Sequence, residues 1–281
     1  MSSLLHFSHK RDIVMSTPPM KRIWYQSFVD PKEQADYFEC LRQTIAQWAD
    51  STTQVDVHGI VPPDLELNRL TELRCSAQVV ANAIAAEQQG YDAFVIGHFQ
   101  DGGLYEARAA VDIPVLALGE SSMLMSCMVG RRIALVTIHP IFIPIHEEQI
   151  IRYGLQHRVV SVKAIETNPQ NLVHAFTDPK AFQNIRTQFE AEVQPLVQAG
   201  VEVIIPAGGG LPALLFARIK DFKIGEAVVI NSINIVVKMA EMSLRVKEQV
   251  GLNVSRAGAF VKPSDKAIKE FLESLNQIRG D

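Results

Sequence analysis

The stretch Tyr91-Asp-Ala-Phe-Val-Ile-Gly-His-Phe-Gln-Asp-Gly-Gly-Leu104 decides the fold prediction. Its apolar run, residues 93–96, stops at Gly97-His98 and is followed by Asp101, a glycine pair and a helix-like segment. A short apolar run that ends in a polar tip and a helix is typical of a parallel strand whose carboxyl end faces a ligand. The pattern therefore places a candidate binding site at His98.

The same alternation of apolar runs and helix-like segments continues on both sides of this stretch. Short apolar or β-branched runs predict two rounds of four strands, at residues 22–27, 54–60, 93–96, 113–118, 132–137, 159–165, 201–205 and 227–230. Alternating strands and helices favour parallel sheets with right-handed crossovers. We therefore predict an α/β fold of two similar subdomains, each a four-stranded parallel sheet flanked by helices, with the ligand cleft between them.

The predicted subdomains divide the chain unequally. Residues 21–119 together with 232–281 are assigned to the first, because the last helices are expected to return to it, and residues 120–231 to the second. Residues 1–20 lack the apolar centre of a signal peptide and are predicted to be a flexible N-terminal extension. The Lys/Glu run at 264–273 is expected to form the solvated face of a helix.

Composition narrows the choice of partners and compartment. The 281 residues carry 27 Lys and Arg against 31 Asp and Glu, a net charge of −4, so no basic surplus suggests nucleic acid or an anionic membrane. The longest apolar stretch, residues 133–145, is interrupted by prolines and too short to span a bilayer. Three widely spaced cysteines favour a reducing, cytoplasmic setting and small buried side chains over disulfides. A small-molecule substrate is the partner that remains.

Several stretches resemble the aspartate/glutamate/hydantoin racemase superfamily, and its hydantoin and allantoin racemase branch in particular. The resemblance spans residues 22–263. The stretches that carry it are Asp92–Leu104, Ile113–Ser121, Ile133–Thr137, Val228–Ala240 and Ser255–Pro263. It implies the fold described above, cofactor-independent chemistry and a homo-oligomer.

The resemblance also implies a reaction that this chain departs from. Racemases of the superfamily remove the acidic proton beside a carbonyl with one cysteine thiolate and return a proton from a second cysteine on the opposite face. One thiol follows the third strand of each half, and backbone amides of glycine-rich turns stabilise the enolate-like oxygen. Here the first position is His98, followed by Phe99, and the second lies in Ala207-Gly208-Gly209-Gly210. A two-thiol mechanism is therefore not expected.

His98 is the candidate catalytic residue. An imidazole at a strand tip titrates near neutral pH and can act as a general base or acid, although a histidine that only binds neighbouring backbone has the same pattern. Asp101, three residues later, is expected to cap the helix that follows, or alternatively to orient His98.

The remaining candidates are substrate-binding residues. Three successive glycines, Gly208, Gly209 and Gly210, can present bare backbone N–H groups to an anionic oxygen, although a plain tight turn remains open. By the resemblance, Gln26 or Ser27 and Thr137, at the ends of two strands, contact substrate. Phe99 is included for its place beside His98. Glu120 either caps a helix or lines the cleft.

No metal or other cofactor is predicted. His139 and His146 flank a proline-rich loop and, with His98 and Asp101, could form a metal site, but none of them has the local spacing of metal ligands.

The leading functional hypothesis is an isomerase that acts on a small carbonyl compound: a carboxylate, a hydantoin or another cyclic amide. With one candidate base and no thiol opposite, isomerisation, tautomerisation, decarboxylation or hydrolysis is favoured over symmetric racemisation. The alternative is a non-catalytic binding protein of the same fold that has lost both thiols.

Overall fold

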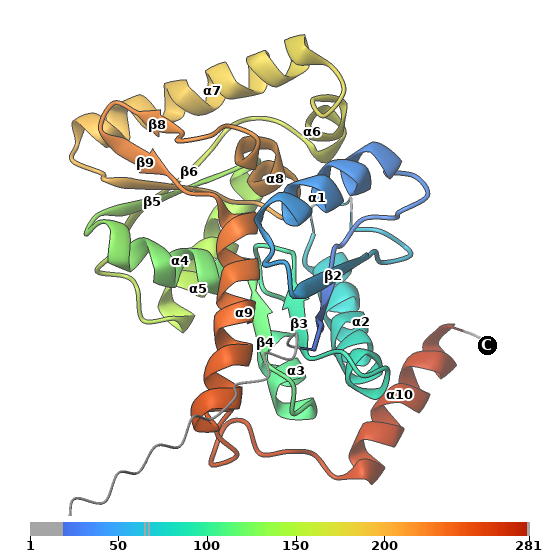
Figure 1. The fold of residues 1–281 in the computed structure, drawn as a ribbon. Helices are drawn as coiled ribbons and strands as arrows, with labels where there is room; N and C mark the ends of the chain where they lie inside the picture. Colours follow the sequence, from blue (N-terminus) through green and yellow to red (C-terminus); the bar gives the residue numbers. More distant parts are fainter. Residues whose placement is uncertain (1–18, 65, 67, 280–281) are drawn as a thin grey trace, which may run out of the picture.

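The computed structural model describes residues 19–64, 66 and 68–279 and has the predicted α/β architecture (Figure 1). Residues 1–18 of the predicted N-terminal extension lie outside the described part. The described strands are β1 (Lys21–Gln26), β2 (Thr53–His58), β3 (Ala93–Ile96), β4 (Val115–Ala117), β5 (Ile133–Thr137), β6 (Val159–Ala164), β7 (Val203–Pro206), β8 (Lys223–Ile224) and β9 (Ala227–Val229).

Helices connect most of these strands, and two more follow β9. They are α1 (Ala35–Trp48), α2 (Arg69–Gln88), α3 (Leu104–Ala110), α4 (Leu118–Val129), the 3-10 turn η1 (Pro140–Phe142), α5 (Ile143–Arg152), α6 (Pro169–His174), α7 (Pro179–Gln198), α8 (Leu211–Ala217), α9 (Ser232–Val250) and α10 (Asp265–Arg279). No helix in the described part of the chain is both long and apolar enough to cross a bilayer.

The first sheet is parallel throughout, with strand order β2-β1-β3-β4. Successive side chains of a strand point to opposite faces, so Ile23 and Tyr25 of β1 enter the core under α1 and α9. Trp24 enters the core under α2 and α3. All four residues of β3 are buried, which explains the uninterrupted apolar run that marks this strand in the sequence.

The second sheet has the order β6-β5-β7-β9-β8, in which β8 is antiparallel to β9. The prediction of four parallel strands is therefore confirmed for the first sheet, whereas the second has an additional edge strand. β8 is only two residues long and turns into β9 at Gly225, whose φ is +57°. A two-residue strand is too short to show an alternating pattern, so the sequence did not reveal it.

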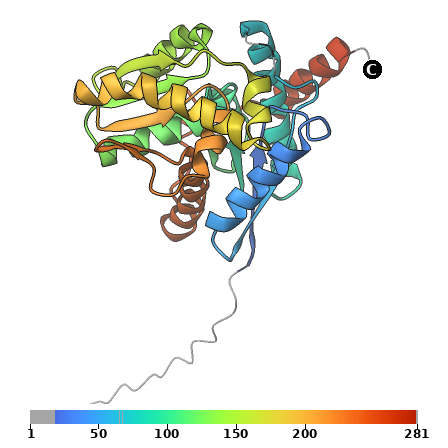
Figure 2. The same ribbon diagram turned by 90° about the horizontal axis from the view of Figure 1, so that it is seen from above.

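One apolar core contains side chains from both halves. Helix α9 connects the two halves of the core, because it packs on β3 and β4 of the first sheet and on α4 and α8 of the second half. Figure 2 shows α7 lying across the second half, on the side remote from α10. The assignment of two separate subdomains stays a prediction.

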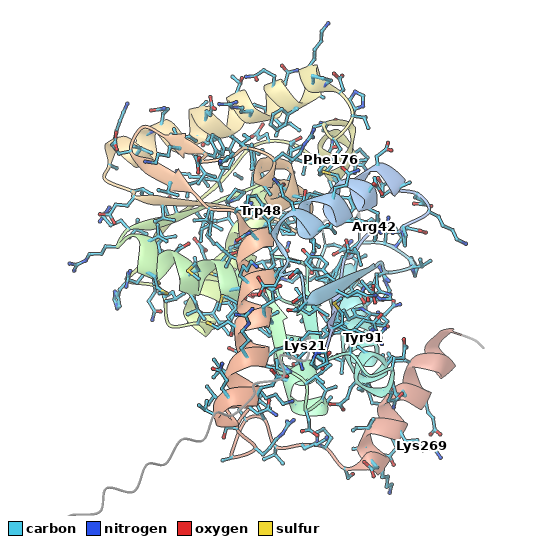
Figure 3. All side chains as sticks on the ribbon, in the orientation of Figure 1. Lys21, Arg42, Trp48, Tyr91, Phe176 and Lys269 are labelled. Atoms are coloured by element: carbon cyan, nitrogen blue, oxygen red, sulfur yellow. The ribbon has the colours of Figure 1, made fainter. Side chains whose placement is uncertain are left out.

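The end of the chain packs against the first sheet's side of the molecule. Ile268, Phe271 and Leu272 of α10 pack against the core under α2 and α3. Figure 1 shows α10 on the same side of the molecule as α2 and α3. The charged face of α10 carries the exposed pairs Lys266–Glu270 and Lys269–Glu273, and Lys269 points away from the body (Figure 3). The Lys/Glu run is thus a solvated helix face, as predicted.

Candidate active site

The loops after β3 and β7 touch where the two halves join. Gly210 lies against the backbone of Gly97, and a Cβ at position 210 would come within 2.6 Å of the Gly97 carbonyl oxygen. A Cβ at position 97 would come within 2.2 Å of the Tyr25 ring. Only glycine permits such an approach at both places. The contact brings His98 opposite the glycine turn 208–210.

A small pocket of about 30 Å³ lies between these loops. Its lining combines polar groups of the first half with the glycine turn of the second: Ser27, Phe28, Val29, Tyr37, Asp64, His98, Ile138, Phe142, Pro169, Gly208, Gly209, Gly210 and Leu211. A volume of this size holds about one water molecule. The ligand cleft expected between the halves is therefore nearly closed.

His98 is fixed by its neighbours on three sides. Its ring is stacked on Phe28, with the ring centroids 4.1 Å apart and the planes 2° from parallel. Nε2 lies 3.1 and 3.2 Å from the two carboxylate oxygens of Glu72 and 3.7 Å from Oδ2 of Asp64. Nδ1 is on the side of the glycine turn, since a Cβ at Gly209 would be 3.6 Å from it. One ring nitrogen thus faces two acids and the other faces Gly209.

The electrostatics of this cluster couple the proton affinity of His98 to Glu72 and Asp64. Burial lowers the pKa of His98, but the charge and hydrogen bond of Glu72 outweigh burial and hold the pKa above its ordinary 6.5. Burial opposes ionisation of Glu72, yet His98 holds the pKa of Glu72 below its usual value. Burial, together with Glu72, raises the pKa of Asp64 to about 6 against the pull of His98. Glu72 is therefore the ionised partner, and Asp64 takes up a proton more readily.

The glycine turn keeps two amide donors available. Gly208 and Gly209 have φ angles of +94° and +87°, which L residues rarely adopt. The N–H of Gly209 donates to Oε1 of Gln100 at 3.1 Å. Within the described part of the chain, the N–H groups of Gly208 and Gly210 donate to no other group. These two amides are free to bind a ligand oxygen.

Thr137 supports the turn and does not itself line the pocket. A Cβ at Gly208 would be 2.6 Å from its Oγ1, which also lies 3.3 Å from Nε2 of His146. Burial lowers the pKa of His146 to about 4, so this ring is neutral. Its Nδ1 is 3.1 Å from Oε1 of Gln149, whose amide nitrogen donates to the carbonyl oxygen of Phe99. A buried network thus connects β5 with the loop that carries His98.

Asp101 does not cap the helix that follows it, contrary to the prediction. α3 has no side-chain cap, and the Asp101 carboxylate instead accepts the backbone N–H groups of Gly119 and Glu120, at 2.8 and 2.7 Å, in the first turn of α4. Tyr153 and Gln149 donate to the same carboxylate at 2.6 and 2.8 Å. Because β4 pairs with β3, the start of α4 lies beside the His98 loop, within reach of the Asp101 carboxylate.

Glu120 also differs from prediction. Its carboxylate forms a two-pronged ion pair with Arg108, in which Nη1 donates to Oε1 at 2.9 Å. It neither caps α4, which has no side-chain cap, nor lines the pocket at His98. A salt bridge between helices α3 and α4 uses this side chain instead.

The structure brings Ser27 to the pocket but not Gln26 or Phe99. Ser27 Oγ is 3.1 Å from the hydroxyl of Tyr37, and both residues line the pocket. The Gln26 amide donates to backbone carbonyls and accepts from Trp24 and Asn82. The Phe99 ring is fully buried and edge-on to His146.

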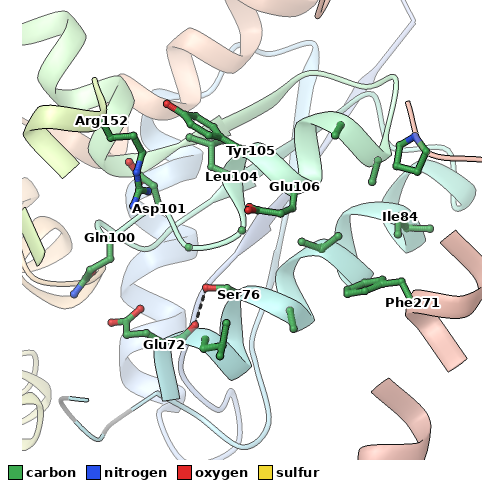
Figure 4. A pocket seen from close by; sticks show the side chains of 18 of the residues that line it. Glu72, Ser76, Ile84, Gln100, Asp101, Leu104, Tyr105, Glu106, Arg152 and Phe271 are labelled. Atoms are coloured by element: carbon green, nitrogen blue, oxygen red, sulfur yellow. Dashed lines mark hydrogen bonds between the residues drawn. The ribbon is translucent and has the colours of Figure 1, made fainter. Parts of the chain in front are cut away.

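A larger groove lies outside the first sheet, between α2, α3 and α10, and is called here the α2–α3 groove. It has a cavity volume of about 870 Å³. Glu72 and Gln100 lie at one end of the groove and Phe271 at the other (Figure 4). Glu72 therefore borders the groove on one side and contacts His98 on the other.

The sequence analysis missed Tyr37, Asp64, Glu72 and Gln100. The order of strands and helices could have revealed two of them, Asp64 and Glu72. Loops after the strands of a parallel sheet share one edge of that sheet, and Asp64 follows β2 while Glu72 is in the first turn of α2, the helix after β2. Both acids therefore lie at the edge that carries His98.

The groups with metal-ligand spacing in the described part of the chain are Asp64, Glu72 and His98, whose ligand atoms lie within 4.8 Å of one another. His139 and His146 are not members of this cluster. His139 accepts a hydrogen bond from the N–H of Ile141. His98, His139, His146 and Asp101 thus do not form a metal site together.

None of the three cysteines lines the pocket at His98. Cys40, Cys75 and Cys127 lie on α1, α2 and α4, partly or fully buried and all unpaired. Burial raises the pKa of Cys75 to about 12, which keeps its thiol protonated. The structure therefore offers no thiolate to take the place of the one that the resemblance implies at position 98.

Comparison with known proteins identifies relatives of this chain and of its fold. The Asp/Glu/Hydantoin racemase family model matches residues 29–240. A hydantoin racemase of Pseudomonas sp. (strain NS671) is 28% identical over 200 residues, which cover 71% of this chain and 75% of the relative. The fold is similar to that of an allantoin racemase from Klebsiella pneumoniae, with a TM-score of 0.68, 24% identity and coverage of 87% and 94% of the two chains. An allantoin racemase from Pseudomonas fluorescens gives a TM-score of 0.70 at 20% identity, covering 86% and 97%.

Proposed function

The chain belongs to the Asp/Glu/hydantoin racemase family, and from this premise we propose that it is an isomerase-type enzyme in which His98 moves a proton on a small carbonyl compound. The substrate class is a carboxylate, a hydantoin or another cyclic amide, as the hydantoin and allantoin racemase relatives suggest. The observation that carries the proposal is the position of His98, with Nε2 against two carboxylates and Nδ1 toward the glycine turn. Cofactor-independent chemistry in a cytoplasmic homo-oligomer is part of the same proposal.

Proton removal begins at Nδ1. With Nε2–H directed at the Glu72 carboxylate, the lone pair of the neutral imidazole is on Nδ1, on the side of the pocket. Nδ1 takes the proton from the carbon beside the substrate carbonyl, and the C–H electron pair moves onto the carbonyl oxygen. The product of this step is an enolate or enediolate beside an imidazolium, which Glu72 stabilises.

The negative oxygen of the enolate needs hydrogen-bond donors on the side of the pocket opposite His98. The N–H groups of Gly208 and Gly210 supply them, in a pocket from which water is largely excluded. Ser27 and Tyr37 add hydroxyl groups from the first half. Thr137 acts one step away, by holding the backbone of the turn.

Return of the proton completes an isomerisation or tautomerisation. The loop 207–210 presents no side chain that could act as a second acid, so both proton transfers are assigned to His98. The imidazolium can also pass its Nε2 proton to Glu72, which borders the α2–α3 groove, and take a solvent proton back by the same route before the return step. This asymmetry favours a one-base reaction over symmetric racemisation.

Substrate entry requires the pocket to open. Small-molecule sites usually have volumes of about 300–1,000 Å³, whereas this one has about 30 Å³. Phe142 and Pro169 line the pocket from the η1 and α6 segments of the second half, and we assign these segments to the part that moves. Closure around the substrate would then exclude water from the enolate.

The proposal is tested by solvent deuterium exchange. The purified protein is incubated in D₂O with 5-substituted hydantoins, allantoin and small carboxylic acids, and the loss of the proton beside the carbonyl is followed by NMR. Exchange into at least one compound, with stereochemical or tautomeric change, is the expected outcome. Ring-opened product would replace the proposed isomerase by a hydrolase.

Gly209→Ala is expected to lower the exchange rate at least about tenfold, because the new methyl group would lie 3.5 Å from Cε1 of His98 in the reacting wall. A non-glycine residue at φ +87° also costs about 1–2 kcal/mol of stability. Gly90→Ala is the matched control: its φ is +76°, with no atom within 4 Å of the added Cβ. Equal exchange rates for the two variants would contradict the role of the turn.

The pH dependence of exchange reports the His98–Glu72 pair. His98 must be neutral to accept a proton, so the rate is expected to fall as pH drops through the pKa of His98, which is raised above 6.5. Glu72→Gln removes the charge that raises this pKa and should move the acid limb to lower pH. If the acid limb of the Glu72→Gln profile lies at the same pH as that of the wild type, Glu72 is not the group that raises the pKa of His98. The rate–pH profile of kcat/KM for both proteins is the measurement.

A non-catalytic ligand-binding protein is the second candidate. It is favoured by the residues at 98 and 207–210, which provide neither of the thiols that the family resemblance implies. Stoichiometric binding of a hydantoin or carboxylate by calorimetry, with neither exchange nor product over hours, would establish this function instead.

A further inference from the structure

Three residues from separate segments direct their polar atoms at one point beside the pocket. Asp64 belongs to the loop after β2, Glu72 to the first turn of α2, and His98 to the tip of β3. Their ligand atoms all lie within 4.8 Å of one another. Imidazole nitrogen and carboxylate oxygen are both good ligands for divalent first-row metals.

The distances around Nε2 of His98 fit a shared metal centre as well as a hydrogen bond. A charged N–H···O⁻ bond is normally about 2.7–2.9 Å long and directed at one oxygen. Nε2 of His98 instead has oxygens at 3.1, 3.2 and 3.7 Å, and it has a single hydrogen to offer. Ligands about 2.1 Å from a tetrahedral metal ion lie about 3.4 Å apart. The distances from Nε2 to the nearer Glu72 oxygen, 3.1 Å, and to Oδ2 of Asp64, 3.7 Å, fall on either side of that value.

The charge balance also calls for a cation. The side chains of Asp64 and Glu72 are only 5% and 15% exposed. Within the described part of the chain, neither acid forms an ion pair with lysine or arginine, so His98 is their counter-charge. Two ionised acids with one imidazolium leave a net charge of −1 in a low-dielectric site. A divalent ion with neutral imidazole leaves none, which lowers the cost of burial.

The surroundings suit an exchangeable metal. Phe28 holds the His98 ring in one orientation by stacking on it. Asp64 and His98 also line the pocket, so an ion between them would have a face open to water or ligand. Three protein ligands with an open position are typical of reactive metal sites, whereas structural zinc sites have four.

We propose that Asp64, Glu72 and His98 form a binding site for one divalent transition-metal ion, and that metal occupancy and proton transfer by His98 exclude each other. The ion takes the lone pair of Nε2, which forces the remaining ring hydrogen onto Nδ1. Nδ1 can then donate a hydrogen bond but cannot accept a proton. The second clause rests on the function proposed above; the metal site itself does not.

Binding is tested directly, without activity. Metal-free protein is titrated with Co²⁺ and Zn²⁺, by visible absorption and by calorimetry. One Co²⁺ per chain is expected, with an affinity at least about tenfold lower in Asp64→Asn and in His98→Gln. Circular dichroism and thermal unfolding verify that the variants are folded.

His174→Ala is the matched control for surface binding. His174 also lies 3.1 Å from a carboxylate, that of Asp178, but this pair is exposed and has no third ligand among the residues that the structure describes. The control is expected to bind Co²⁺ as the wild type does. No stoichiometric ion in the wild type, or equal affinity in Asp64→Asn and wild type, would overturn the site.

The effect of metal on deuterium exchange tests the mutual exclusion separately from the metal site. Stoichiometric Zn²⁺ is expected to abolish deuterium exchange, and EDTA to restore it. Faster exchange with Zn²⁺ would overturn mutual exclusion and the cofactor-independent chemistry, but would support the site. His98-dependent exchange in a protein that binds no metal would overturn the site and leave the proposed function standing.

Discussion

His98→Ala is expected to lower kcat/KM for proton exchange by about 10²–10⁴-fold, the usual contribution of a positioned general base. The loss is large because the described lining of the pocket offers no second imidazole or thiolate: Cys75 is on α2, and His146 is bonded to Thr137 and Gln149. Asp64 remains at the pocket, but its carboxylate lies on the Nε2 side of the ring, 3.7 Å from that nitrogen, and not at the place of Nδ1. Deuterium exchange at saturating and limiting substrate measures the change.

His98→Gln keeps the experiment interpretable if the alanine variant unfolds. Glutamine is similar in size and can hydrogen-bond to Glu72, but cannot move a proton near neutral pH. His174→Ala, on the exposed surface of the second half, controls for loss of a histidine and should behave as wild type. Exchange by His98→Gln within threefold of wild type would remove His98 from the mechanism.

The position of His98 was predictable because it depends on local pattern and general topology. A fully buried strand reads as an apolar run, and the carboxyl ends of parallel strands meet at one edge. The same reasoning applies to Gly208–Gly210 after β7. The contact between Gly97 and Gly210 confirms that these two tips face each other.

The partners of His98 were not predictable in the same way. Asp64 and Glu72 lie in a loop and at a helix start, where acids are common for other reasons, such as turns and the helix dipole. What distinguishes them is their distance from Nε2, and this depends on how α2 packs against the sheet. The sequence alone therefore does not predict the distance between these carboxylates and Nε2 of His98.

Asp101 illustrates an error of a different kind. The sequence suggested a helix cap, and the residue does bind a helix start, but that of α4 and not of α3. Local spacing favours the next helix, whereas the positive φ of Asp101, +57°, and the pairing of β4 beside β3 direct the carboxylate to the later one. Asp101 thus accepts backbone N–H groups at a helix start, as a cap does, but the helix is α4 and not α3.

Asp101→Asn is expected to lower the free energy of unfolding by about 3 kcal/mol or more. The carboxylate is buried and accepts from two backbone N–H groups of α4 and from Gln149 and Tyr153, all at 2.6–2.8 Å. Asparagine tolerates a positive φ, so the backbone strain is little changed. Its NH₂ group, however, would face N–H donors where an acceptor is needed, and at least one buried donor would lose its partner.

Asp36→Asn is the control, because Asp36 lies on the exposed first turn of α1 and should change stability by no more than about 1 kcal/mol. Urea unfolding followed by circular dichroism compares the three proteins. A loss below about 1 kcal/mol for Asp101→Asn would show that the network rearranges at little cost. Asp101 would then not be required to position His98, although its carboxylate connects the start of α4 and Gln149 with the loop that carries His98.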